Sequence, residues 1–429
     1  MTSAARRPPA PGGRPRARPE TEGLIVTTTP TAPALALPAA HGSCPFDPPP
    51  AYDQAARQGA VTPAELPDGA FCWLVTGHQE VRTVLSDPRF SADARHPGFP
   101  FLTPGRRALA VTNPSFIRMD DPEHARLRRM VTKDFLVHRV DAMRPGIQRI
   151  VDETIDRMTA AGTGADLVTD FALPVPSLVI CLLLGVPYED HELFQAQSRT
   201  LLDNRATPAE VEAAQRGLTG YLTELAARKR SHPADDMLSR LAAREDVSPA
   251  EIAATGLLLL VAGHETTANM TALSTVALLR RPEQAARLRA DPELLRGAVE
   301  ELLRYLTIVQ SGLPRVAVED VELGGTLVRA GQGVLAMLST ANRDERLFGA
   351  PGEGAADELE VSRDARRHLA FGFGVHQCLG QPLARAELQI ALETLLRRLP
   401  GLRITVPEDE LVFRGHSVVY GVDSLPVAW

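Results

Sequence analysis

Residues 371–382 read Phe-Gly-Phe-Gly-Val-His-Gln-Cys-Leu-Gly-Gln-Pro, and the fold that we expect is inferred first from this segment. It is a glycine-rich loop that carries Cys378 to the start of a helix predicted to run to about Arg398. The free amides and the dipole of a helix start favour a thiolate, because they place partial positive charge beside the sulfur. The glycines let the backbone approach something large and flat. A thiolate on such a loop can ligate iron or act as a nucleophile.

The segment resembles Phe-x-x-Gly-x-His/Arg-x-Cys-x-Gly, the haem-binding signature of the cytochrome P-450 haem-thiolate monooxygenases. With this chain's residue frequencies, a chance match is expected on the order of once per ten thousand chains. The resemblance implies that Cys378 is the axial ligand of a haem b iron and that His376 binds a haem propionate. It also assigns Phe371, Gly372 and Gly380 to the cofactor-binding loop. A thiolate ligand pushes electron density toward iron and favours dioxygen activation.

A single long helix is predicted in the middle of the chain. Ser248 and Glu251 form a capping-box pattern around Pro249, and no further breaker occurs until Pro282. A helix of about 33 residues is roughly 50 Å long, so it must cross the whole molecule.

This helix contains Ala-Gly-His-Glu-Thr-Thr at 262–267, which resembles the family's oxygen-activation motif. We expect Gly263 to leave room for a ligand and the Thr266 hydroxyl to bond back to the carbonyl of Ala262. Glu265 and Thr266 together can relay protons and are the candidate catalytic residues. Without the resemblance, a solvated charge and an ordinary helix residue would be the more common interpretation of this pair.

Glu301 and Arg304 stand three residues apart on one helix face, as in an ordinary ion pair. They also resemble the family's structural Glu-x-x-Arg, whose third partner is an arginine in a later loop. Arg343 fits that place. The downstream loop departs from the family pattern, since Glu345 stands where proline is common and Leu359 where phenylalanine is common.

His124 and Arg128 present two donors on one face of a helix that begins near Pro122, which could also be a plain surface helix. By resemblance they bind haem propionates, and Arg315 occupies a third such position. Anionic propionates in a poorly hydrated site need charge-assisted partners, and the arginine fork suits carboxylates.

The expected fold is mainly α with small β-sheets, an α+β, helix-rich triangular prism around a buried haem, as the resemblance implies. Residues 1–42 are rich in proline and arginine and predict a flexible leader, while residues 43–429 form one catalytic domain. Strand signals are few, and they fall at 71–75, 316–323, 326–338, 402–406 and 418–422.

Composition excludes several classes of protein. A net charge of −7 argues against nucleic acid as a partner. The four cysteines lie far apart, as is usual in a reducing compartment, and the longest apolar stretch, 178–186, is too short for a membrane span. We therefore expect a cytoplasmic protein.

The resemblance implies a monooxygenase that inserts one atom of dioxygen, by hydroxylation or epoxidation, into a hydrophobic secondary metabolite such as a polyketide, macrolide or terpenoid. The sequence carries no flavin or iron–sulfur module, so a ferredoxin and its reductase, with NAD(P)H upstream, are the implied electron donors. A loop at 96–105 suggests a mobile lid. The expected substrate-pocket residues are Leu258, Val261, Ala262, Ile308 and Val309. The arginines that could meet an acidic partner are Arg126, Arg129, Arg363, Arg366, Arg367 and Arg385.

Three alternatives remain at this point. A peroxygenase of the same fold would usually lack the Thr266 hydroxyl, and a non-catalytic haem binder would need no proton relay. A hydrolase with Cys378 as nucleophile would have no use for the propionate-type donors.

Overall fold

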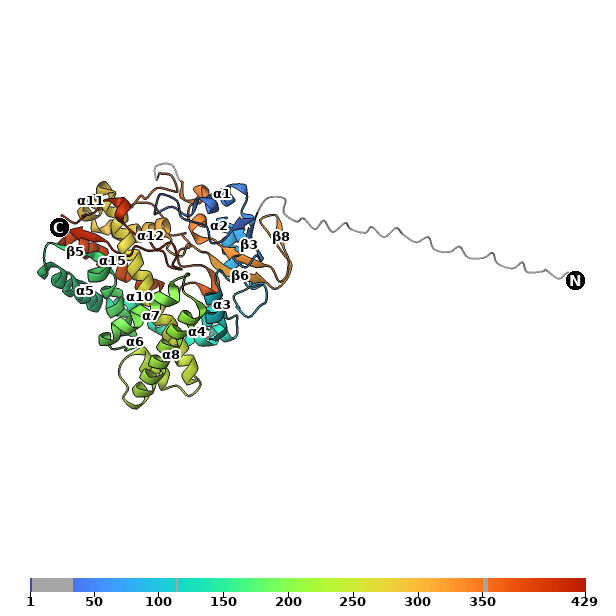
Figure 1. Ribbon diagram of the computed structural model, residues 1–429, viewed down its shortest axis with the longest axis horizontal. Helices are drawn as coiled ribbons and strands as arrows, with labels where there is room; N and C mark the ends of the chain where they lie inside the picture. The colour runs from blue at the N-terminus through green and yellow to red at the C-terminus, as the bar shows by residue number, and fades with distance from the viewer. Residues whose placement is uncertain (2–33, 113–114, 350–353) are drawn as a thin grey trace. The chain divides into compact units, whose positions relative to one another are not determined.

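Helices make up most of the folded unit in a computed structural model, which describes Met1 and residues 34–112, 115–349 and 354–429 (Figure 1). The α-helices are α1 (Pro50–Gln58), α2 (His78–Ser86), α3 (Pro104–Thr112), α4 (Glu123–Thr132), α5 (Val137–Ala160), α6 (Pro174–Leu184), α7 (His191–Leu202), α8 (Pro208–Ser231), α9 (Met237–Ala242), α10 (Pro249–Leu279), α11 (Pro282–Ala290), α12 (Leu295–Leu306), α13 (Leu338–Ala341), α14 (Glu345–Phe348) and α15 (Gln381–Arg398).

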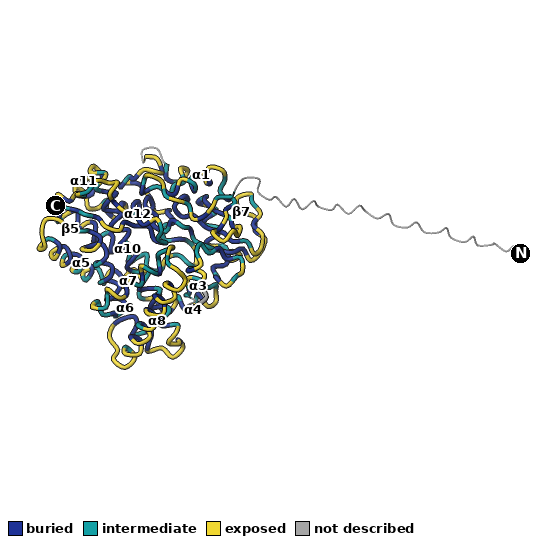
Figure 2. The backbone as a smooth tube through the Cα atoms, in the orientation of Figure 1, coloured by how far each residue is buried: buried dark blue, intermediate teal, exposed yellow. Residues whose placement is uncertain are grey.

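The long helix α10 has 31 residues and begins with the predicted capping box, in which the Ser248 side chain accepts from the Glu251 N–H and the Glu251 carboxylate accepts from the Ser248 N–H. It packs against α6, α8 and α15. Because it is covered on nearly all sides, it is apolar all round rather than amphipathic. The burial colouring shows the same arrangement, with the α10 and α12 backbone dark in the middle and exposed loops at the periphery (Figure 2).

The strands form three small sheets. They are β1 (Leu35–Ala36), β2 (Val61–Glu65), β3 (Phe71–Val75), β4 (Phe90–Ser91), β5 (Gly164–Asp166), β6 (Leu313–Ala317), β7 (Val321–Leu323), β8 (Thr326–Val328), β9 (Gly333–Ala336), β10 (Arg403–Ile404) and β11 (Pro426–Ala428). The largest sheet has the order β1-β2-β3-β9-β6-β4, in which β2 and β3 pair antiparallel and β3 and β9 pair parallel. The other two sheets have the orders β10-β11-β5 and β7-β8.

The strand predicted at 418–422 is wrong. The N–H of Val418 donates to the carbonyl of Leu202 and that of Tyr420 to the carbonyl of Ile308, so this backbone joins two other segments instead of a sheet ladder. The other four strand predictions coincide with β3, β6 and β7, β8 and β9, and β10.

The predicted boundary of the leader at residue 43 is also wrong. Strand β1 pairs parallel with β2, and Leu37 is 6% exposed, so the folded unit starts at Ala34. Residues 2–33 of the predicted leader lie outside the described residues.

The predicted lid, 96–105, is anchored over its first half. Phe99 packs with Val316 in a small cluster, and a Cβ atom built on Gly98 would overlap the carbonyl oxygen of Gly331. The second half leads into α3, which packs against α8. Mobility of this loop stays a prediction.

Within the described residues, every helix is too short or too polar to cross a bilayer.

Candidate functional site

The cysteine loop closes on itself before α15. The N–H of Cys378 donates to the carbonyl of Phe371 over 2.8 Å, and Gly372 adopts φ +70°, which favours glycine. Gly374 adopts φ +73°, and a Cβ there would overlap the carbonyl oxygen of Leu85 in α2. Position 374 therefore requires glycine because the loop packs closely on α2. We had expected all three glycines of this loop to let the backbone approach a flat group. A Cβ on Gly380 would lie 4.0 Å from the Cys378 sulfur.

Cys378 borders an internal space. Burial raises the pKa of its thiol, whereas the N–H groups of Gly380 and Gln381 and the charges of Arg128 and Arg385 act in the opposite direction. The side chain nevertheless has accessible surface. Both observations hold only if the sulfur faces a space enclosed by protein. A metal cation placed there would deprotonate the thiol outright.

Four cationic or basic groups gather near this loop. The His124 and His376 rings have centroids 4.0 Å apart, and Nη2 of Arg128 donates to the Gln377 carbonyl over 2.5 Å. Burial, with the nearby charges of Arg315, His124 and Arg128, lowers the pKa of His376 to about 3. Burial, with the charge of Arg118, lowers the pKa of Arg315 to about 10. The structure thus brings together all four predicted propionate partners.

These residues fit the carboxylates of a haem. Nδ1 of His124 lies 2.9 Å from Asp121, which is exposed, while Nε2 of His124 is buried and has no hydrogen-bond partner among the described residues. Arg315 is 5% exposed, and its Nη1 donates to the carbonyl of Pro314 over 2.8 Å. A site so rich in donors and so poor in carboxylates needs an anion.

Arg118 was missed in the sequence. Its charge lowers the pKa of Arg315, so it belongs to the same electrostatic cluster. The available signal was its place directly before the run 119–129 that carries the family resemblance.

The middle of α10 presents one open face. Oγ1 of Thr266 donates to the carbonyl of Ala262 over 2.6 Å, as predicted. Ala262 is exposed, and Leu258 and Val261 are half-buried, although most of this helix is buried. These three predicted pocket residues therefore share one accessible stretch of the helix.

Two other expectations for α10 turn out differently. A Cβ on Gly263 would lie 2.6 Å from Cδ1 of Ile180, so Gly263 allows close packing with α6, and the prediction that it leaves room for a ligand is wrong. The Glu265 carboxylate, 3% exposed, lies 3.6 Å from Nη1 of Arg414 and 3.5 Å from Nδ2 of Asn269. Arg414, which the sequence did not single out, fixes this acid from the C-terminal segment.

The buried pair in α12 has a different third partner from the one expected. Nε and Nη2 of Arg304 donate to both oxygens of Glu301, over 2.6 and 2.8 Å. Arg363 supplies the third group, with its Nε 3.1 Å from Oε1 of Glu301. Arg343 instead donates to the carbonyls of Asp357, Phe46 and Tyr305, so its expected place beside Glu301 is wrong.

The same finding removes Arg363 from the arginines offered for a partner surface, since it is 2% exposed. Arg126, Arg129, Arg366 and Arg367 are exposed, and Arg385 is half-buried. Arg385 forms a two-pronged ion pair with Glu300 of α12, over 2.7 and 2.9 Å.

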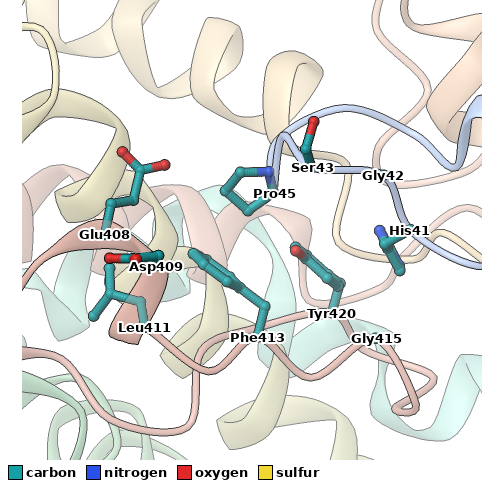
Figure 3. A pocket seen from close by; sticks show the side chains of 10 residues that line it. All are labelled: His41, Gly42, Ser43, Pro45, Glu408, Asp409, Leu411, Phe413, Gly415 and Tyr420. Carbon is teal, nitrogen blue, oxygen red and sulfur yellow. The ribbon is translucent and has the colours of Figure 1, made fainter.

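Ile308 and Val309 follow α12; Ile308 is buried and Val309 half-buried. The N–H of Tyr420 donates to the Ile308 carbonyl, and Tyr420 lines a pocket of about 560 Å³. Figure 3 shows Phe413 and Tyr420 between His41 and the acidic pair Glu408 and Asp409. None of its lining residues is a predicted site residue, so this pocket is separate from the cysteine site.

Comparison with known proteins gives consistent matches. The cytochrome P-450 family model matches residues 220–408. The chain is 64% identical over 408 residues to cytochrome P-450-SU2 of Streptomyces griseolus, covering 94% of this chain and 100% of that protein. It is 49% identical over 391 residues to pentalenic acid synthase of Streptomyces avermitilis, covering 90% and 96%. Among solved structures, the mycinamicin VIII C21 methyl hydroxylase MycCI of Micromonospora griseorubida superposes with a TM-score of 0.86 at 40% identity, covering 92% of this chain and 100% of that chain.

Proposed function

We propose that Cys378 is the axial ligand of haem b and that its propionates are bound by His124, Arg128, Arg315 and His376. The proposal follows from the fact that this chain belongs to the cytochrome P-450 family. The chain is an oxidoreductase of that family, a monooxygenase that inserts one atom of dioxygen into a hydrophobic small molecule, and the family implies a haem-iron cofactor. Bound haem iron supplies the site with redox chemistry and dioxygen activation.

The observation that carries the proposal is a combination of two features. The Cys378 thiol is enclosed by protein, and the hydrogen-bond donors near it outnumber the carboxylates that could pair with them. Cys378 has accessible surface although burial raises its pKa. The neighbouring His124 has an unpartnered buried nitrogen, and Arg315 is 5% exposed. A hydrolase would need a base beside the thiol and has no use for this excess of cationic donors.

The chain's own residues hold protons at two places along α10. The Thr266 hydroxyl, bonded to the Ala262 carbonyl, is a proton donor at Oγ1 on the accessible stretch of the helix. Glu265 is the acid beside it in sequence, and Arg414 fixes its carboxylate at 3.6 Å. We assign to Thr266 the delivery of protons to the reaction and to Glu265 the role of their source.

The substrate is proposed to be a secondary metabolite of the polyketide, macrolide or terpenoid kind. Pentalenic acid synthase and the mycinamicin hydroxylase, which the chain resembles, support this class by their names. The apolar Leu258, Val261 and Ile308 suit such a molecule.

We propose a ferredoxin and its reductase as electron donors, in the cytoplasm, with NAD(P)H upstream. The exposed arginines Arg126, Arg129, Arg366 and Arg367 could meet an acidic partner. The cysteines in the described part of the chain are free, as expected in a reducing compartment.

The first prediction tests the ligand. Purified parent protein should be coloured and, when reduced under carbon monoxide, should show the red-shifted Soret band of thiolate ligation. Cys378→His should retain some haem but lose that band, because imidazole replaces the thiolate. Cys181→Ser, at a buried cysteine of α6, is the matched control and should keep the band. Survival of the band in Cys378→His would show that another residue binds the iron.

A further inference from the structure

Two half-buried arginines, Arg106 and Arg118, have no acidic partner among the described residues. Arg106 lies in the first turn of α3, and Arg118 follows Phe116 in a short helical turn. Burial lowers the pKa of each guanidinium to about 10, and no carboxylate contributes to either shift. Among the described residues, Nη2 of Arg106 is buried and has no hydrogen-bond partner.

The carboxylate closest in sequence to Arg118 is already engaged. Asp120 accepts hydrogen bonds from the Ser91 hydroxyl and, over 2.8 Å, from the Ala92 N–H. Its charge acts on Arg315. Arg118 itself lies over the ring of Phe99, with its guanidinium carbon 5.3 Å from the centroid. A desolvated guanidinium without a counter-charge lowers stability, so two that repel each other electrostatically indicate a place where an anion binds.

Arg106 lies within electrostatic reach of Arg118. The charge of Arg118 lowers the pKa of both Arg315 and Arg106. A Cβ on the neighbouring Gly105 would lie 3.1 Å from Val211 of α8. Arg106 therefore stands where α3 meets α8.

We propose that Arg106 binds an anionic group of the substrate, so that the enzyme selects hydrophobic organic acids. This inference rests on the proposed function, because it assigns a substrate class to the expected substrate pocket. The guanidinium fork pairs with a carboxylate through two parallel hydrogen bonds, which fixes orientation as well as affinity. An acid held at α3 would leave its apolar part for the accessible stretch of α10 at Leu258, Val261 and Ala262.

A haem propionate has the same chemistry as a substrate carboxylate, so the test must separate the two. Decanoic acid and dehydroabietic acid, each beside its methyl ester, are offered to the purified holoenzyme, and dissociation constants are measured by equilibrium dialysis. At least one acid should bind the parent at least tenfold more tightly than its ester. Arg106→Gln should weaken that acid at least tenfold and its ester less than twofold, because only the acid loses its counter-charge.

Arg107→Gln is the matched control. Arg107 is the next residue of α3, is exposed, and pairs with Asp68 at 3.1 Å, so the substitution removes the same charge from the same helix. It should leave both constants unchanged. Equal binding of acid and ester by the parent, or equal weakening in the two variants, would overturn the proposal.

Thermal unfolding provides a second readout. Without ligand, Arg106→Gln should unfold at the same temperature as the parent or higher, because a desolvated charge without a counter-charge is gone. The acid should raise the unfolding temperature of the parent alone. If Arg106→Gln instead loses haem while its affinity for the acid is unchanged, Arg106 serves a propionate and the proposal is wrong. Dialysis does not depend on haem, so a parent without the thiolate spectrum would contradict the proposed function and not the acid site.

Discussion

At the scale of single residues, the Thr266 hydroxyl makes the hydrogen bond that we predicted. Its catalytic role stays a prediction. Threonine hydroxyls in helices commonly donate to the carbonyl four residues earlier, as Thr266 does to Ala262. Thr271 makes the same bond to Thr267 over 2.9 Å. The hydrogen bond alone therefore does not distinguish a relay residue. Thr266 differs in being only half-buried, beside the exposed Ala262.

Thr266→Ala should uncouple electron consumption from product formation. Alanine maintains the helix, and the substitution leaves Cys378 and the propionate donors untouched, so haem content and substrate affinity should stay near the parent values. With saturating substrate and redox partners, product per NAD(P)H should fall several-fold and hydrogen peroxide should rise. Thr271→Ala, at a buried threonine of the same helix with the same bond, should leave coupling unchanged. Parent-like coupling in Thr266→Ala would assign the relay to other groups.

The sequence could not predict the residue roles that depend on contacts between distant parts of the chain. Arg363 stands 62 positions from Glu301, and nothing in its neighbourhood separates it from the exposed Arg366 and Arg367. Arg343 is half-buried and Arg363 is buried, both bind backbone carbonyls, and only the fold decides which one reaches Glu301.

At the scale of elements, α12 is the helix that supports the loops around the site. One face carries Glu301 and Arg304, both 0% exposed, and Arg304 also donates to the carbonyls of Asn342 and Ala356. The adjacent Glu300 binds His368 and Arg385, which lie before and after the cysteine loop. α12 thus fixes both ends of the segment that holds Cys378.

Glu301→Ala should destabilise the protein strongly. It leaves the buried charges of Arg304 and Arg363 without their counter-charge, and breaking one partner of such a set typically costs about 3–5 kcal/mol. We expect the free energy of unfolding in denaturant to fall by that amount and haem to be lost. Glu293→Ala, at an exposed position just before α12, should have little effect. Parent-like stability of Glu301→Ala would show that the ion network contributes nothing.

Glu300 should make stability depend on pH. Burial would raise its pKa, but hydrogen bonds from His368 and Arg385 outweigh it and lower the pKa to about 2. The unfolded chain, with an ordinary glutamate pKa of about 4.3, binds that proton more readily, so the contribution is complete above that pH and is lost as the pH falls toward 2. It amounts to roughly 3 kcal/mol, since one pKa unit is about 1.4 kcal/mol.

Denaturant titrations at a series of pH values test this dependence. Glu300→Gln should be less stable than the parent at pH 6, and the difference should shrink as the pH falls below about 4, because the parent then loses the same interaction. Glu293→Gln is the control and should follow the parent throughout. A constant gap between Glu300→Gln and the parent down to pH 3 would contradict the lowered pKa.

At the scale of the whole molecule, the fold is that of the cytochrome P-450 family, and its main features could be predicted. Helix α10 and the start of α15 follow from local signals, namely a capping box and a glycine-rich loop before proline. The leader boundary and the strand at 418–422 were predicted wrongly because both depend on partners distant in sequence. Leu35 pairs with Ala64 in β2, and Tyr420 bonds to Ile308.

The contact between Gly98 and Gly331 limits how this enzyme can change over generations. The two residues stand far apart in the gene, yet a side chain on Gly98 has no room against Gly331, and a side chain on Gly331 is strained at φ +83°. Heritable variation at either position is therefore selected against before it can affect chemistry. New substrate preferences should arise instead through mutations between residue 102 and the end of α3, where a laboratory evolution library would best be concentrated.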